Sequence, residues 1–176
     1  MAHPGKRFIS PNEVETMVFD WGTIKWLSEP NVTTTNRFSA GVVLLEPGKG
    51  HARHNHPGAE EILYVVSGEG NQMVDDGGET WHPIAAGDLI HIPADMYHAT
   101  VNTGWEPLKM MAIYCPPGPE AFLKTLAGFF DSLIDGQVTK HPGRPEGSAF
   151  ILSVIVGDAA LHHHAVGDIA VEQLGD

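Results

Sequence analysis

The chain has 176 residues, enough for one domain, and its 42% hydrophobic content allows a sizeable core. Ten basic and 22 acidic residues give a formal charge of −12, which argues against nucleic acid and anionic membranes as partners and favours a small-molecule substrate. The single cysteine, Cys115, excludes an internal disulfide. The start, MAHPGKRFIS, lacks the apolar core of a secretory signal, and no apolar run approaches the roughly 20 residues of a membrane span. The cytoplasm is the expected location.

Residues 1–36 are predicted to form an N-terminal strand arm. Within it, residues 14–27 mix β-branched and aromatic side chains around Gly22, a pattern that predicts two short strands. Trp21 and Trp26 on these strands could line a substrate entrance, but large aromatic residues in such strands are more often part of a core or subunit contact.

Residues 37–117 are predicted to form the β-rich body of the domain. Short β-prone segments alternate with turn signals, including a hairpin at residues 76–78, and no helical period occurs before residue 119. This succession predicts an all-β protein, either an antiparallel barrel or a sandwich.

Residues 118–176 are predicted to be a C-terminal helix and tail that pack on the same single domain. Apolar residues between Phe122 and Ile134 recur with helical spacing, which predicts one amphipathic helix with Gly136 as its cap. This helix would cover the outside of the barrel or a second subunit. Residues 150–156 are an apolar run that could add a strand.

Metal-binding side chains gather in residues 48–68. His54 and His56 are two positions apart, so on an extended backbone both imidazoles project from the same face. The Pro57-Gly58 turn can then bring Glu61 back beside them. These three residues predict a chelating site that needs a fourth ligand.

The spacing between Gly48 and Gly68, G-x5-H-x-H-x4-E-x6-G, resembles the first motif of the cupin superfamily. Residues 87–102, GDLIHIPADMYHATVN, resemble the second motif, with Asp95 where the family usually has glycine. Aspartate tolerates left-handed backbone better than most residues, so we expect this turn to survive. The resemblance implies a cupin jelly-roll barrel, an antiparallel double sheet that brings His98 to the site.

A metal centre follows from the same resemblance. Three imidazoles and one carboxylate suit one divalent transition metal, namely Mn, Fe, Ni, Co, Cu or Zn, and can leave positions open for water or substrate. The alternative is that these polar residues occupy the barrel interior without binding a metal, but burying them without a metal or water would cost free energy. The predicted ligands are His54, His56, Glu61 and His98.

Other polar residues are expected to play lesser parts. Alternation directs Glu60 away from the site, as a solvated or salt-bridged carboxylate. His51 and His91 are expected to be surface or packed histidines, and His162 to His164 could bind metal only adventitiously. Candidates to hydrogen-bond the ligands are Arg37, Tyr64, Gln72 and Tyr114.

Two enzymatic functions are compatible with such a centre. The sequence pattern of residues 61–117 resembles that of the archaeal cupin-type phosphoglucose isomerases. This resemblance implies sugar-type aldose–ketose isomerisation through a metal-bound enediolate. No run of basic residues marks a phosphate site, so a neutral or carboxylated sugar fits better than a sugar phosphate. The exit segment PPGPEAFLKTLAGFF instead resembles small cupins such as quercetin dioxygenases.

We predict a metal-dependent enzyme, with isomerisation favoured over oxygen chemistry and Glu61 as the candidate catalytic base. A non-catalytic cupin that binds a metabolite or a metal is the third hypothesis, because cupins host many chemistries. A homodimer is the expected assembly, since cupins commonly form dimers.

Overall fold

The computed structural model describes residues 5–75, 80–126 and 128–130. By internal contacts the chain divides into residues 1–146 and 147–176, and the account below concerns the described part of the first unit. The predictions for residues 131–176, including the strand at 150–156 and the histidines at 162–164, lie outside the described residues. Among the described residues, no helix is long and apolar enough to cross a membrane.

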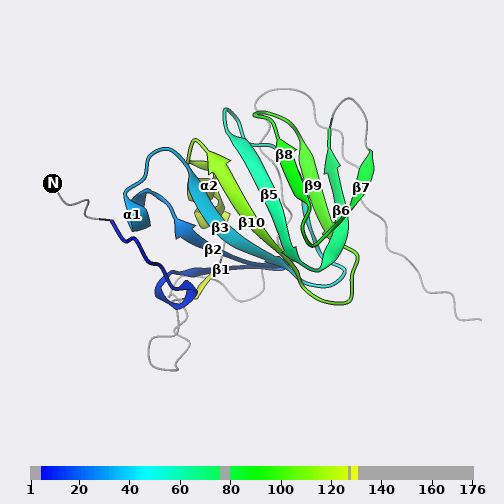
Figure 1. The fold of residues 1–176 in the computed structure, drawn as a ribbon, viewed down its shortest axis with the longest axis horizontal. Helices are drawn as coiled ribbons and strands as arrows, with labels where there is room; N and C mark the ends of the chain where they lie inside the picture. Colours follow the sequence, from blue (N-terminus) through cyan, green and yellow to red (C-terminus); the bar gives the residue numbers. More distant parts are fainter. Residues whose placement is uncertain (1–4, 76–79, 127, 131–176) are drawn as a thin grey trace, which may run out of the picture. The chain divides into compact units, whose positions relative to one another are not determined.

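Two antiparallel sheets make up the fold (Figure 1). The larger sheet contains, in spatial order, β11 (Gly128–Phe130), β1 (Thr16–Phe19), β2 (Gly22–Ser28), β3 (Ser39–Leu45), β10 (Leu108–Cys115), β5 (Glu60–Ser67) and β8 (Leu89–Ile92). The smaller sheet contains β4 (Gly50–His54), β9 (His98–Asn102), β6 (Glu69–Val74) and β7 (Trp81–Ala85). This arrangement confirms the predicted jelly-roll fold.

The helical elements are short and lie outside the sheets. They are a 3-10 turn, η1 (Pro11–Glu13), and the helices α1 (Pro30–Thr33) and α2 (Pro119–Leu126). Buried carboxylates fix α2 to the body: Glu120 accepts a hydrogen bond from the Ser39 hydroxyl at 2.9 Å, and Glu29 accepts one from the Lys124 ammonium at 2.6 Å. The C-terminal helix therefore belongs to the same compact body as the sheets.

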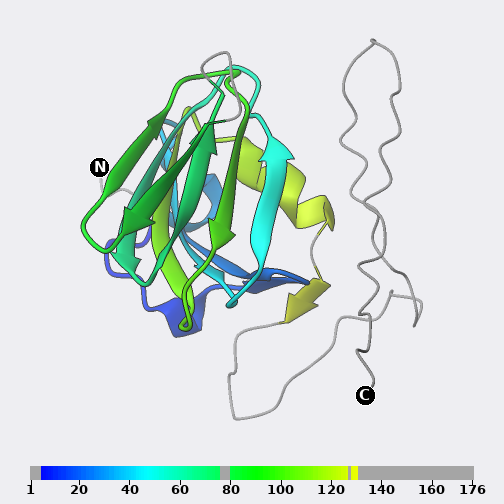
Figure 2. The ribbon, with the colours of Figure 1, turned by 90° about the vertical axis from the view of Figure 1, so that its right-hand side faces the viewer.

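The predicted helix is confirmed from Pro119 to Leu126 but ends earlier than the apolar pattern indicated. Residues Gly128–Phe130 instead form β11, which pairs with β1 at the edge of the larger sheet, seen beside the blue N-terminal strands in Figure 2. Pairing with β1 supplies these residues with backbone hydrogen bonds, so tertiary contact outweighs the local helical period.

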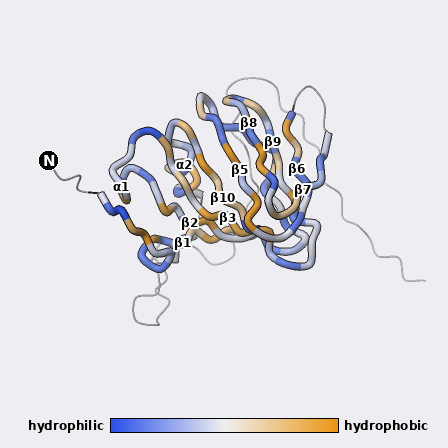
Figure 3. The backbone as a smooth tube through the Cα atoms, in the orientation of Figure 1, coloured by the Kyte–Doolittle hydropathy of each residue, from blue (hydrophilic) through white to orange (hydrophobic). Residues whose placement is uncertain are grey.

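The core lies between the sheets because the strands alternate apolar and exposed positions. In β5, for example, Leu63 and Val65 are buried while Tyr64 and Val66 are exposed. Figure 3 shows the hydrophobic residues concentrated along the strands and the hydrophilic ones along the connections. Alternation of this kind is typical of a sheet with one buried face, and that buried face also holds the residues of the candidate site.

Candidate metal centre

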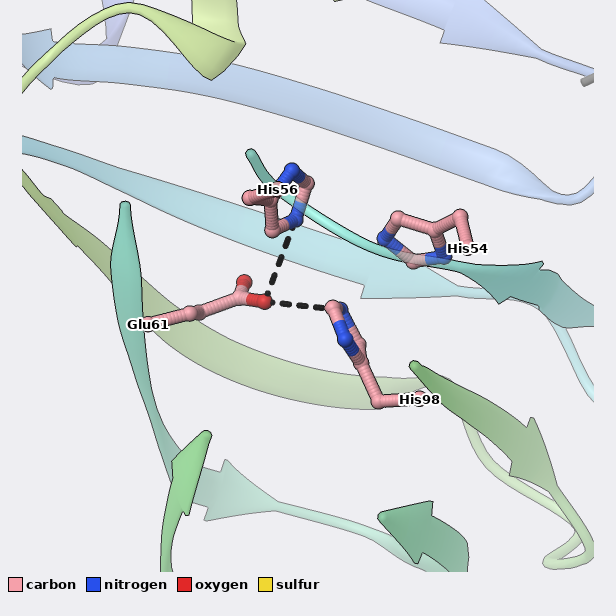
Figure 4. A group of neighbouring side chains, drawn as sticks. All are labelled: His54, His56, Glu61 and His98. Carbon is pink, nitrogen blue, oxygen red and sulfur yellow. Dashed lines mark ion pairs between the residues drawn. The ribbon is translucent and has the colours of Figure 1, made fainter. Parts of the chain in front are cut away.

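Four side chains from three parts of the barrel converge on one point (Figure 4). His54 ends β4, His56 follows it by two residues, Glu61 lies near the start of β5 and His98 begins β9. One ligand atom from each lies within 4.8 Å of the others. His98 and Glu61 are only 2% and 4% exposed. The structure therefore brings together the four residues predicted as ligands.

The strands position these ligands in different ways. Pairing of β4 with β9 places His54 directly opposite His98. β4 ends at His54, so His56 reaches the site from the connection to β5 rather than from a regular strand. Gly68, the last glycine of the first motif, has φ 86°, and a Cβ there would lie 2.8 Å from the Pro107 carbonyl oxygen. Only glycine fits this turn without strain.

Hydrogen bonds to backbone carbonyls orient two of the imidazoles. The Nδ1–H of His54 donates to the Ala52 carbonyl at 2.7 Å, and that of His98 donates to the Met96 carbonyl at 3.0 Å. A carbonyl can only accept, so each Nδ1 carries a proton, which leaves Nε2 as the nitrogen available to bind a metal. Such hydrogen bonds are the usual support of histidine ligands.

The ligand atoms approach one another as they would around a cation. The Glu61 Oε2 atom lies 2.9 Å from His98 Nε2 and 3.4 Å from His56 Nε2. Neighbouring ligand atoms around a metal with bonds of about 2.1 Å are about 3 Å apart when the bonds are at right angles. Among the described residues, His56 Nε2 and Glu61 Oε2 are buried without a hydrogen-bond partner. This donor set fits one divalent transition-metal ion.

The electrostatics keep two of the ligands in their binding forms. Burial raises the pKa of Glu61, but the adjacent imidazoles of His56 and His98 outweigh burial and lower the pKa to about 2. Burial, assisted by the neighbouring histidines, lowers the pKa of His54 well below 6.5. At neutral pH the carboxylate is therefore ionised and the His54 imidazole is neutral, as metal binding requires.

These shifts predict that the metal-free protein loses stability in acid. A folded-state pKa of His54 below 6.5 means that the unfolded chain binds more protons below that pH, so stability falls as the pH drops below about 6.5. The lowered pKa of Glu61 adds a second loss as the pH falls from about 4.5 towards 2. Thermal denaturation of metal-free protein should give a melting temperature several degrees lower at pH 5 than at pH 7.5. Equal values would contradict the predicted shifts.

Asp95 connects the second motif to the segment that carries His56. Its φ of 67° is left-handed, as expected for the position where the family usually has glycine. Its carboxylate accepts a hydrogen bond from Gly58 N at 3.0 Å, and its backbone N–H donates to the His56 carbonyl at 3.3 Å. Asp95 thus holds the turn that follows His56.

Replacing Asp95 by glycine is expected to weaken metal binding several-fold while leaving the fold intact. Glycine accepts the left-handed conformation, so the substitution removes only the hydrogen bond to Gly58 N and loosens the segment that positions His56. Metal affinity would be measured by competition with a chromogenic chelator. The matched control is Asp95→Asn, which retains the acceptor; an Asp95→Gly protein that binds metal as tightly as this control would refute the role.

The remaining candidates divide between the site and the surface. Tyr114 lies beside His56, with ring centroids 4.6 Å apart, and burial and the nearby Glu61 carboxylate raise the pKa of its hydroxyl. Gln72 is buried inside the barrel and accepts a hydrogen bond from Thr100 at 2.6 Å. Arg37 and Tyr64 are exposed and do not face the site.

The expectation for Glu60 and His91 is confirmed: their exposed side chains form an ion pair at 3.0 Å on the outer face. Trp26 is buried in the core against Tyr114, as expected for a packed aromatic residue. Trp21 is also buried, but it contributes to the wall of the metal site.

His51 is the residue whose position could not be foreseen from alternation. It is packed, as one of its two expected environments required, but it packs inside the site with its ring centroid 4.0 Å from that of His54. His51 and His54 are three positions apart and would face opposite ways on a regular strand. The pairing of β4 with β9 shifts register between them, which is the mark of a β-bulge, and both side chains turn inward.

Comparison with known proteins supports the fold and the family. Residues 41–114 match the Cupin domain family. Polyketide synthase CurC of Streptomyces cyaneus is 32% identical over 149 residues, which are 80% of this chain and 92% of CurC. The chain belongs to the cupin superfamily. The similarity of this cupin to CurC thus extends over nearly the whole length of CurC.

Two further proteins are similar over part of the chain. Glucose-6-phosphate isomerase of Thermococcus kodakarensis is 38% identical over 68 residues, 38% of this chain and 35% of the isomerase. The crystal structure of the oxalate decarboxylase of Lactobacillus farciminis has a TM-score of 0.60 and 26% identity, covering 65% of this chain and 35% of the decarboxylase. The chain thus spans about a third of the length of each of these two relatives.

Proposed function

We propose that this cupin is a metal-dependent enzyme that moves a proton at a carbon next to a carbonyl group of a small oxygenated metabolite, the step on which isomerisation depends. The observation that carries the proposal is the buried Glu61 carboxylate, whose Oε2 atom lies 2.9 Å from His98 Nε2 and 3.4 Å from His56 Nε2 without a hydrogen-bond partner among the described residues. A site that fixes one carboxylate and three imidazole ligands suits a divalent cation with positions left for substrate oxygen atoms.

When bound, a divalent metal at this site supplies Lewis-acid stabilisation of negative charge on a substrate oxygen. Glu61 remains ionised because its pKa is lowered to about 2, and the buried hydroxyl of Tyr114 lies near the same carboxylate. Leu63, Met110 and Ile24 are among the apolar residues that line the site and limit the access of water. A carboxylate with so low a pKa is a good ligand and a weak base, so the role of Glu61 as base stays a prediction.

The comparisons support this reaction class without deciding the substrate. The isomerase of T. kodakarensis is named for glucose 6-phosphate, and CurC is named for polyketide synthesis. Sugars and polyketides both carry carbonyl groups with an acidic hydrogen on a neighbouring carbon. None of the residues that line the site in the described part of the chain is lysine or arginine, which favours an uncharged substrate over a sugar phosphate.

Deuterium exchange tests the proposal. Metal-loaded protein would be incubated in D2O with acetoin or dihydroxyacetone, two uncharged α-hydroxyketones, while NMR follows the carbon-bound hydrogens and an electrode follows oxygen. We expect metal-dependent deuterium incorporation at the hydroxyl-bearing carbon without oxygen uptake. Oxygen uptake matched to substrate loss would replace the proposal with a dioxygenase, and the absence of both would favour a non-catalytic binding protein.

The proposal includes a homodimer. The outer face of the larger sheet exposes apolar side chains on neighbouring strands, including Tyr64 of β5, its partner Leu89 of β8, and Val66. Burying such side chains against a second copy would be favourable. Light scattering of the purified protein should give about twice the mass of one chain, and a monomer at all concentrations would remove this part of the proposal.

A further inference from the structure

The wall of the metal site is mostly apolar, which restricts the ligands that it can accept. Besides the ligands His54, Glu61 and His98, the lining contains Trp21, Ile24, Val43, Leu45, Leu63 and Met110 on the side of the larger sheet. The polar lining residues other than the ligands are His51, Thr100 and Tyr114, and Trp21 adds an indole N–H donor. Hydroxyl groups of a substrate that faced the apolar side would lose their hydrogen bonds to water without replacement.

Two of these three polar residues already have partners. The Thr100 hydroxyl donates to Gln72 Oε1 at 2.6 Å, and the Tyr114 hydroxyl lies near the Glu61 carboxylate, so that burial together with this carboxylate raises its pKa. In the described part of the chain, neither imidazole nitrogen of His51 has a hydrogen-bond or ion-pair partner. Apart from the indole N–H of Trp21, His51 is therefore the polar group of the lining that is left to meet a ligand.

The imidazole of His51 is also held in place. Its ring centroid lies 4.0 Å from that of His54 and 4.9 Å from that of Trp21, and Trp21 in turn stacks on Phe19 at 4.4 Å with nearly parallel planes. The bulge in β4 directs it inward, and its backbone pairs with Thr100. A side chain fixed by packing beside a metal ligand can recognise a substrate group at a defined position.

We propose that His51 is a substrate-contacting residue, which hydrogen-bonds one polar group next to the metal-chelating atoms of a compact ligand whose remaining skeleton is apolar. This inference rests on the proposed function and narrows its substrate class. A carbonyl compound with few hydroxyl groups, as in polyketide-type metabolites, matches the lining, whereas a polyol does not.

Matched small chelators test the contact. The enclosed part of the cavity measures only about 20 Å³, room for about one water molecule, so the smallest probes are used and the rest of each probe would lie in the open part of the site. Acetohydroxamate offers two oxygen ligands to a metal, glycolohydroxamate adds one hydroxyl group, and 2,3-dihydroxypropanohydroxamate adds a second. Calorimetry would compare their binding to protein that carries its native metal, in the wild type and in His51→Phe and His51→Gln. His51→Leu serves if the phenylalanine variant does not fold, and elemental analysis accompanies every titration.

We expect glycolohydroxamate to bind the wild type about three- to tenfold more tightly than acetohydroxamate, which is the range of one net hydrogen bond. His51→Phe should abolish this difference, His51→Gln should retain part of it, and neither should alter metal content or acetohydroxamate affinity. The second hydroxyl group should weaken binding to the wild type.

Three results would overturn the inference: an unchanged gain from the hydroxyl group in His51→Phe, no gain in the wild type, or loss of metal from the His51 variants. If acetohydroxamate itself does not bind the metal-loaded wild type, the metal has no open coordination positions of the kind that the proposed function requires. That result would contradict both the proposed function and the inference that rests on it. Failure of the contact alone leaves acetohydroxamate binding intact, so the two failures are distinguishable.

Discussion

Removing the metal with a chelator is expected to lower the melting temperature of the wild-type protein by about 10 °C. A ligand present at about 1,000 times its dissociation constant stabilises the folded state by about 4 kcal/mol. For a chain of this length, each kcal/mol corresponds to about 2–4 °C. Without the metal, Glu61 and three imidazoles remain packed within 4.8 Å with ligand atoms that lack hydrogen-bond partners. Differential scanning calorimetry with and without the chelator measures the effect.

The control for this prediction is a protein that cannot hold the metal. A His54→Ala/His98→Ala double variant loses two facing ligands from β4 and β9, so its melting temperature should not respond to the chelator. A wild type that is equally insensitive would show that the four side chains are satisfied without a metal.

Replacing Glu61 by glutamine is expected to reduce metal affinity by on the order of 100-fold or more, because the substitution removes the only negative charge among the four ligands and offers an amide group in its place. Deuterium incorporation into a substrate should fall with the metal content. Chelator competition gives the affinity, and NMR gives the exchange rate.

The chain offers a matched control for Glu61→Gln in the adjacent residue. Glu60 occupies the opposite face of β5, is exposed and pairs with His91, so Glu60→Gln makes the same chemical change outside the site. It should leave metal affinity and exchange unchanged, since exposed ion pairs contribute little. Equal losses in both variants would point to a general electrostatic effect and contradict the assignment of Glu61 as ligand.

The ligands were predictable from sequence because their positions depend on local spacing and on a motif pair that fixes the barrel register. His54 and His98 face each other across paired strands, so a sequence pattern is sufficient to place them. His51 was not predictable, since a bulge reverses the facing that alternation would assign. The end of α2 at Leu126 likewise depends on pairing between β11 and β1, which are more than 100 residues apart.

The packing of the residues that line the site could not be predicted from the sequence either. Trp21 was compatible with a core or an entrance, and the structure places its ring against His51. Gln72 and Tyr114 were two of four candidates to support the ligands, and only the fold separated them from Arg37 and Tyr64. Alternation along a strand assigns a side to each residue, but the contacts across a barrel depend on how the two sheets pack.

Elemental analysis by mass spectrometry of protein purified without a histidine tag tests the central claim most directly. The wild type should contain close to one divalent transition-metal ion per chain, and the His54→Ala/His98→Ala variant should contain almost none. Both proteins retain His162 to His164, so adventitious binding there would appear equally in both. A wild type without metal, even after anaerobic reloading, or a variant with the same metal content, would contradict a metal centre built from His54, His56, Glu61 and His98.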